Sequence, residues 1–345
     1  MKKQKIEILR EKPKEELIND LRNRRCSILR AIKCHKLRLE MFLPGIVCTI
    51  IVRLLCFIAK LKDRKEWINT IRTYFTKVLD KYAPYEIDSR DKLPINRSGL
   101  VLGFNHPSLG EILRLLNLVM KEYPNHRYLF PVNLPWYEAL CPAIEKLEVA
   151  GIYITPVITP STRQKIERTA GVKAVEKIAP ITISFNGVYL NLCRDFAKTG
   201  DIILVAPSAT RQQTVFNTDF ELCQRKKIEP QTMSLLVQTL AKKVENCVVE
   251  FVPLAVRPPS GYKKGLNLSE TYLIGVGEMF CFDEAYELTN DKYGAFRGRK
   301  FDFEFLARIS RRLFSMGKHD MIAPLKSDDA INGLAELFKD RAAAI

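Results

Sequence analysis

The order of apolar and polar positions divides the chain into a helical first part and a second part with a different rhythm. Residues 65–82 predict an amphipathic helix, because apolar side chains recur at every third or fourth position. From about residue 91, short apolar runs alternate with helical stretches. These runs are rich in β-branched and aromatic residues, and they predict strands at 99–104, 127–132, 152–155, 181–184, 202–206, 249–256 and 271–276.

The stretches between these strands have the apolar spacing of helices. They predict helices at 108–121, 136–148, 161–178, 188–199 (closed by Gly200) and 230–245. Strands that alternate with helices predict an α/β fold with a mainly parallel central sheet flanked by helices. Binding sites in such folds lie at the carboxyl ends of the strands, so the candidate chemistry is sought there.

A long apolar segment, residues 41–60, precedes this pattern. It is nearly long enough to span a bilayer, which takes about 20 apolar residues. However, Arg53 lies inside it, Pro44 and Gly45 lie near its start, and both of its flanks are basic. These features favour a helix that lies in the membrane interface. A membrane span and a buried soluble helix are the two alternatives.

The length and composition allow a sizeable core, because 47% of the 345 residues are hydrophobic. We expect a basic helical region with the membrane segment at 1–90, an α/β domain at 91–285 and a helical C-terminal extension at 286–345. Residues 1–40 carry thirteen Lys and Arg against six Asp and Glu, which suits contact with an anionic surface.

The formal net charge of +16 indicates an anionic partner, such as a membrane surface, a nucleic acid or a phosphorylated substrate. The sequence contains no zinc module, glycine-rich arginine tract or aromatic RNA-binding signature, which disfavours nucleic acid. Nine cysteines without a C-x-x-C pair favour a reduced, intracellular setting. We therefore expect a peripheral or monotopic protein on the cytoplasmic face of a membrane, without a metal site or other cofactor. The oligomeric state stays open.

The candidate chemistry lies directly after the predicted strand 99–104, where Asn105 and His106 are followed by Pro107. Proline keeps the preceding residue out of the helical conformation and suits the first helical position. Glu111 is then expected one turn inside the helix, where the His106 imidazole can fold back toward its carboxylate. A histidine that only caps the helix is the alternative.

A carboxylate on one ring nitrogen fixes the tautomer of a histidine and leaves the other nitrogen free to take a proton from a hydroxyl. The sequence offers no G-x-S-x-G nucleophile elbow, and Ser108 is as well explained as a helix cap. His106 and Glu111 therefore form a candidate pair that activates a hydroxyl of the substrate itself.

A second candidate site follows the predicted strand 202–206, where a proline turn brings Ser208, Thr210 and Arg211 to the strand end. Hydroxyls beside a guanidinium suit the oxygens of a phosphate or phosphodiester. An ordinary surface loop is the alternative reading of this stretch.

Five blocks in this order resemble the glycerolipid acyltransferases, the family of glycerol-3-phosphate and lysophosphatidate acyltransferases. The resemblance covers roughly residues 90–285. The blocks are Asn105-His106 with an acid five positions after the histidine, Gly151-Ile152-Tyr153-Ile154, Pro207-Ser208-Ala209-Thr210-Arg211, Val-Pro-Leu-Ala-Val at 252–256 and Ile-Gly-Val-Gly-Glu at 274–278.

The resemblance implies transfer of an acyl chain from acyl-CoA or acyl carrier protein to a hydroxyl of a lysophospholipid or related glycolipid, without an acyl-enzyme. It implies that His106 is the general base, preceded by Asn105, and that Glu111 orients it. It implies further that the acceptor's phosphate or headgroup faces Ser208, Thr210 and Arg211, and that Pro253 lines the acyl or thioester side.

The chain departs from the family's pattern at several positions. Glu111 stands where the family usually has Asp, and Ala206, Ser208 and Ala209 stand where it has Phe, Glu and Gly. Pro156 lies near the position of a usual arginine. These departures keep a second hypothesis open, that the protein is a non-catalytic lipid-binding relative of the family.

Overall fold

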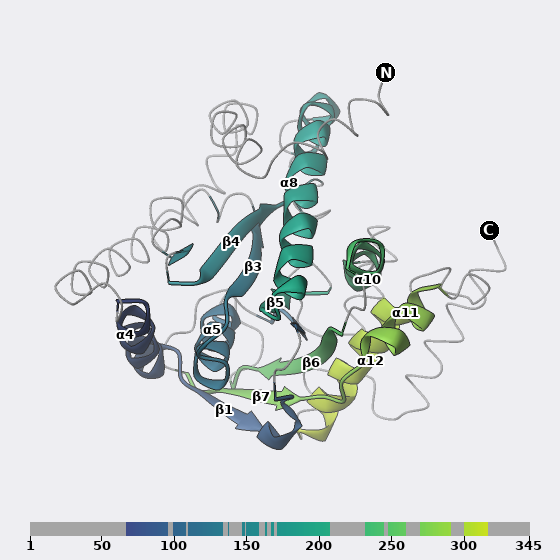
Figure 1. Cartoon of the computed structure of the whole chain (residues 1–345). Helices are drawn as coiled ribbons and strands as arrows, with labels where there is room; N and C mark the ends of the chain where they lie inside the picture. The colour runs from purple at the N-terminus through teal and green to yellow at the C-terminus, as the bar shows by residue number, and fades with distance from the viewer. Residues whose placement is uncertain are drawn as a thin grey trace. The chain divides into compact units, whose positions relative to one another are not determined.

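The structure is a computed structural model (Figure 1). It describes residues 67–95, 99–107, 110–133, 137, 147–148, 150–158, 163, 167–168, 171–207, 232–244, 248–259, 270–290 and 300–316. The predicted membrane segment 41–60 and nearly all of the predicted helix 136–148 lie outside the described residues. The three predicted parts of the chain stay a prediction.

Seven strands form one sheet in the order β1-β7-β6-β2-β5-β3-β4. Their bounds are β1 Tyr85–Asp88, β2 Leu100–Phe104, β3 Tyr128–Asn133, β4 Ile152–Val157, β5 Ile202–Val205, β6 Glu250–Arg257 and β7 Tyr272–Val276. Strand β2 pairs in parallel with β5 and β6, and β1 pairs in parallel with β7, whereas β6 and β7 are antiparallel. The predicted α/β fold with a mainly parallel sheet and flanking helices is confirmed.

The described helices are α4 Trp67–Tyr82, α5 Glu111–Glu122, α8 Val172–Lys198, α10 Thr232–Lys243, α11 Phe282–Asn290 and α12 Lys300–Ser315, with a short 3-10 turn, Arg90–Lys92. The predicted helices at 65–82 and 230–245 are therefore confirmed to within a few residues. Gly200 follows α8 with a φ of 72°, the left-handed conformation that glycine adopts after a helix end, as the sequence predicted.

One predicted strand is wrong. Residues 181–184 are not a strand but part of α8, which also joins the predicted helices 161–178 and 188–199. The β-branched run at 181–183 lowers helix propensity by less than about 1 kcal/mol per residue, and Pro180 costs about 3 kcal/mol. Burial outweighs these costs, since apolar side chains recur with helical spacing at Phe185, Val188, Tyr189, Leu192, Cys193 and Phe196.

The chain divides into two compact units. The first comprises 1–71 and 129–193, and its described part holds β4 and most of α8. The second comprises 72–128 and 194–345 and holds β1, β2, β5, β6 and β7 with α5, α10, α11 and α12. The candidate catalytic residues His106 and Glu111 belong to the second unit.

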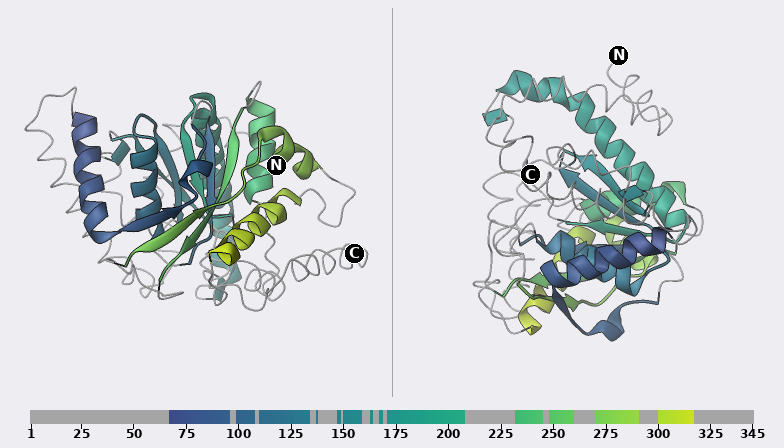
Figure 2. Two further views of the ribbon diagram at one scale, coloured as in Figure 1. Left: turned by 90° about the horizontal axis from the view of Figure 1, so that it is seen from below. Right: turned by 90° about the vertical axis from the view of Figure 1, so that its left-hand side faces the viewer.

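Helices cover both faces of the sheet in the second unit. A Cβ on Gly275 of β7 would meet Met316 and Arg312, so this residue faces α12. Tyr272 of the same strand stacks on Arg114 of α5. Side chains alternate between faces along a strand, and these two positions are three residues apart. Helices α5 and α12 therefore cover opposite faces, and α4 lies beside α5 (Figure 2), where Asn117 donates a hydrogen bond to Asp80.

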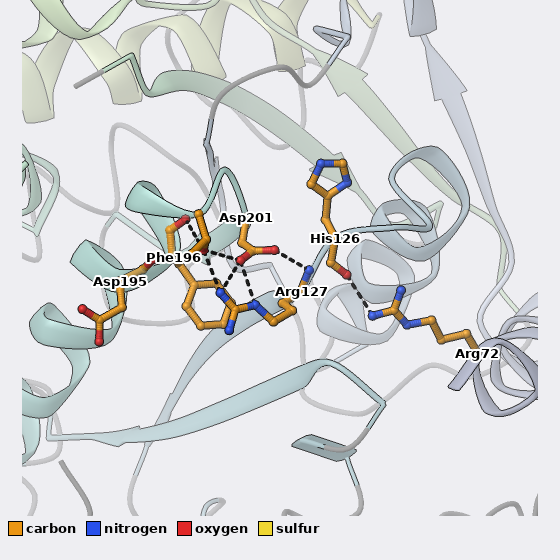
Figure 3. Close-up of polar contacts among 7 residues, drawn as sticks. Arg72, His126, Arg127, Asp195, Phe196 and Asp201 are labelled. Atoms are coloured by element: carbon orange, nitrogen blue, oxygen red, sulfur yellow. Dashed lines mark hydrogen bonds and ion pairs between the residues drawn. The ribbon is translucent and has the colours of Figure 1, made fainter. Parts of the chain in front are cut away.

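The amino-terminal ends of the strands are joined by an ion pair (Figure 3). The Arg127 backbone N–H and Nε each donate to the Asp201 carboxylate at 2.8 Å, and the guanidinium lies 4.9 Å from the Phe196 ring centroid. The Ile202 N–H donates to the Arg127 carbonyl, and the Leu100 N–H donates to the Asp201 carbonyl. This cluster joins the beginnings of β2, β3 and β5, at the edge opposite to His106.

Candidate active site

Three neighbouring parallel strands end at the same edge of the sheet. Gly103 of β2 pairs with Val205 of β5 and with Pro253 of β6. Because β7 is antiparallel to β6, the beginning of β7 lies at this edge too, and so does the beginning of β1. The segments that meet here are the residues after β2, the residues after β5, the end of β6 and the residues before β1 and β7.

Asn105 joins the end of β2 to β6. Its buried side chain accepts a hydrogen bond from the Val256 N–H at 2.6 Å and donates one to the Val256 carbonyl at 2.8 Å. The amide therefore satisfies both backbone groups of one residue in the neighbouring strand, as a further strand residue would. This places Asn105 as the anchor that fixes where the chain leaves β2, directly before His106.

His106 and Glu111 are brought together as the sequence predicted. Nδ1 of His106 and Oε1 of Glu111 form a hydrogen bond. The glutamate is completely buried, and 18% of the histidine side chain is exposed. The imidazole therefore rests against a buried carboxylate on one side and reaches the surface on the other.

The local backbone differs from the prediction in one respect. Helix α5 begins at Glu111, with Gly110 as the residue before its first turn, rather than at Pro107. Glu111 is thus the first residue of the helix and not one turn inside it. His106 and Glu111 thus meet across the connection between β2 and α5.

Arg114 is a site residue that the sequence analysis missed. It is completely buried, one helical turn after Glu111, on the same side of α5. Three backbone carbonyls accept hydrogen bonds from its guanidinium: Pro84 at 3.3 Å, Gly110 at 2.9 Å and Glu270 at 2.8 Å. A signal existed in the sequence, since an arginine among the apolar residues of an amphipathic helix indicates that this arginine is buried.

The environment of Arg114 acts on its charge in two directions. Burial lowers the pKa of the guanidinium, whereas the Tyr272 phenol and the Glu111 and Glu270 carboxylates raise it. Arginine keeps its proton in proteins because its ordinary pKa is above 12. The residue therefore places a permanent positive charge in the buried surroundings of Glu111.

Pro253 lies inside β6, where it is paired with Gly103 and its carbonyl accepts a hydrogen bond from the Gly277 N–H at 2.8 Å. A Cβ on Gly277 would lie 3.2 Å from Pro253. The blocks at 252–256 and 274–278 are thus adjacent in the sheet. The predicted contact of Pro253 with an acyl chain or thioester stays a prediction.

The second candidate site lies outside the described residues. Ala206 and Pro207 follow β5 at the same edge as His106, and Ser208, Thr210 and Arg211 come next in the chain. Their predicted contact with a phosphate or headgroup stays a prediction.

Two further observations concern the described part of the chain. Within the described ranges, no group of three or more His, Cys, Asp or Glu side chains is placed to hold a metal ion. Among the helices that the structure describes, none is both long and apolar enough to cross a membrane.

The Phe-rich stretch 301–306 forms helix packing. Phe301 and Phe305 of α12 are buried against Phe280, with ring centroids 5.1 Å and 5.7 Å away, and Phe301 also packs edge-on against Phe251 of β6. These rings pack between α12 and the sheet, on the strands that lead to the site.

Comparison with known proteins shows a structural likeness but no sequence relative. No family model and no curated protein matches the sequence. Among solved structures, the chain is similar to the 1-acyl-sn-glycerophosphate (LPA) acyltransferase PlsC from Thermotoga maritima, with 12% identity and a TM-score of 0.39, over 81% of this chain and 97% of that chain.

Proposed function

We propose that the protein is a membrane-associated O-acyltransferase. It moves an acyl chain from a thioester, on CoA or acyl carrier protein, to a hydroxyl of a lysophospholipid or related glycolipid. The observation that carries the proposal is the contact between His106 Nδ1 and the completely buried Glu111 carboxylate, with the imidazole partly exposed at the carboxyl edge of the sheet. The order of the five sequence blocks supports the same chemistry.

In the proposed mechanism, Nε2 of His106 takes the proton of the acceptor hydroxyl as its oxygen attacks the thioester carbonyl carbon. The carbon–oxygen bond forms, and the tetrahedral intermediate then collapses with cleavage of the carbon–sulfur bond. The imidazolium returns the proton to the leaving thiolate, so the products are an ester and a free thiol. Glu111 accepts the hydrogen bond from Nδ1–H throughout and stabilises the imidazolium.

The acceptor's headgroup is assigned to the loop after β5, where Ser208, Thr210 and Arg211 supply hydroxyls and a guanidinium. The membrane lies next to the basic N-terminal region and the segment 41–60. The donor's acyl chain or thioester is assigned to the side of Pro253.

The test is a transfer assay on the purified full chain in detergent. Labelled acyl-CoA and acyl carrier protein donors are crossed with lysophospholipid, glycerol-3-phosphate and glycolipid acceptors. His106→Ala should lower turnover by about 10²–10⁴-fold, the usual contribution of a general base. His126→Gln is the matched control, because this histidine lies between α5 and β3, next to Arg127 in the cluster at the amino edge (Figure 3).

Turnover that persists in His106→Ala would overturn the mechanism. Binding of lysolipid without turnover on any pair, and with no effect of His106→Ala, would instead favour the non-catalytic lipid-binding relative. Circular dichroism of each variant shows whether a loss of turnover comes from a loss of fold.

A further inference from the structure

Arg114 is held by contacts from several segments of the chain. Its guanidinium donates to carbonyls from three separate segments, before β1, before α5 and before β7, and lies 3.7 Å from the centroid of the Tyr272 ring. The Pro84 carbonyl also accepts the Tyr272 N–H at 3.1 Å. These contacts hold the positive charge of this α5 residue at the beginnings of β1 and β7.

The first residue of α5 is the completely buried Glu111. An ionised carboxylate without water is costly unless charges or hydrogen bonds compensate it. A neutral imidazole supplies one hydrogen bond but no charge. Arg114 supplies the charge, because it lies one turn further along the same helix and its buried guanidinium donates to the carbonyl of Gly110, the residue directly before Glu111. The first N–H groups of α5 add to this field.

The charge state of Glu111 decides which nitrogen of His106 carries the proton. An ionised carboxylate only accepts hydrogen bonds, so Nδ1 must be the N–H and Nε2 keeps its lone pair. A protonated Glu111 would donate its O–H to Nδ1, and the neutral imidazole would then carry its proton on Nε2. The second arrangement has no free lone pair to take a proton from a hydroxyl.

We propose that Arg114 is a positioning residue that keeps Glu111 ionised and thereby holds His106 in the tautomer with its proton on Nδ1 and a free Nε2. The catalytic consequence of this tautomer rests on the proposed function, since it matters only if His106 is a general base. The tautomer itself is independent of any activity and is measurable in the resting protein.

The experiment is ¹⁵N NMR of the full chain with labelled histidine, at pH about 8.5, where an ordinary imidazole is neutral. The chain has four histidines, and His106→Gln assigns the His106 signals by their loss. The wild type should show a protonated Nδ1 and an unprotonated Nε2. Arg114→Met and Arg114→Gln should show the reverse, whereas Arg114→Lys, which keeps the charge, should keep the wild-type tautomer.

Lys121→Met is the matched control. It removes a cation from the same helix, but Lys121 is 40% exposed and pairs with Asp80 at the surface, so the His106 tautomer should not change. Truncation of Arg114 also removes three hydrogen bonds, and the comparison of the lysine and glutamine variants separates charge from these bonds. If the role of Arg114 were purely structural, the His106 tautomer would change equally in Arg114→Lys and Arg114→Gln.

Each result decides the proposal. A wild type with Nε2 protonated, or neutral variants that keep the wild-type tautomer, overturns it. If the neutral variants do not fold while Arg114→Lys does, the tautomer of the wild type and of Arg114→Lys decides: the proposal stands if both carry the proton on Nδ1 and falls if either carries it on Nε2. If Arg114→Lys fails to fold as well, Arg114 is purely structural and the proposal falls. The transfer assay is separate, because a wild type with the expected tautomer but without turnover would contradict only the proposed function.

Discussion

At the scale of single residues, close packing limits which side chain a position can hold, even where the sequence pattern sets no limit. Gly103 is the clearest case, because a Cβ at this position would lie 2.3 Å from Cε1 of Phe305. The residue lies in β2, two positions before Asn105, so its small size lets α12 pack closely against the strand that leads into the site. The neighbouring rings of Phe280 and Phe301 leave Phe305 little room to move.

We expect Gly103→Ala to lower the free energy of unfolding by about 1–3 kcal/mol, because a methyl group is forced into a packed ring. Gly187→Ala is the matched control. Nothing lies within 4 Å of a Cβ there, and the residue is inside helix α8, so this change should stabilise the protein by about 0.5–1 kcal/mol. Urea unfolding followed by circular dichroism measures both values. Equal effects of the two substitutions would contradict the packing argument.

At the scale of elements, one helix in the second unit is capped by another. Asp302, in the first turn of α12, is completely buried and accepts the N–H of Met233 at 2.8 Å and the N–H of Ser234 at 3.1 Å. The Ser234 hydroxyl donates to the same carboxylate. The beginning of α10 thus finds the acceptor for its unpaired N–H groups in α12, about 70 residues away in the chain.

Asp302→Ala should lower the free energy of unfolding by about 2–4 kcal/mol, because it leaves buried donors at the start of α10 without an acceptor. Asp302→Asn should lower the free energy of unfolding by less, since the amide oxygen of asparagine still accepts a hydrogen bond. The control is Asp283→Ala in the exposed first turn of α11, with an expected loss below about 1 kcal/mol. Chemical denaturation measures all three, and a loss for Asp302→Ala no larger than for Asp283→Ala would show that the cap contributes little.

At the scale of the whole molecule, the net charge of +16 is the property that bears on partners. A Lys or Arg near an anionic membrane surface contributes about 1 kcal/mol to binding, and salt screens this attraction. A phosphodiester polymer would attract the same charge. The two partners, a membrane and a nucleic acid, differ in one respect. A membrane also binds apolar side chains, and this contribution is not screened by salt.

The full chain should bind vesicles with anionic lipid at least tenfold more tightly than neutral vesicles, and the difference should shrink when salt is raised from about 0.05 M to about 0.5 M. Sedimentation with vesicles measures the binding. Residual binding at high salt is expected, because apolar contacts are not screened by ions. Tighter binding to duplex DNA than to anionic vesicles would instead support a nucleic-acid partner.

Much of the fold could be predicted from the sequence. Six of the seven strands lie where apolar runs predicted them, and β1 was missed because Tyr85–Asp88 is short and half polar. The one false strand, at 181–184, shows where local preference fails. Its β-branched residues favour a strand. The segment is nevertheless helical, because the side chains further along α8 are buried at helical spacing.

What the sequence by itself determined is most of the succession of elements and the meeting of His106 with Glu111. Both depend on residues that are close together in the chain, and the local sequence pattern predicts the geometry of such neighbours. Only the tertiary structure decided how Asn105 is anchored and what surrounds Glu111. Asn105 bonds Val256, 151 positions away, and Arg114 bonds carbonyls before β1 and β7. Every residue has the same backbone carbonyl. A pattern of side chains therefore does not predict which carbonyl will accept a hydrogen bond from a buried polar group.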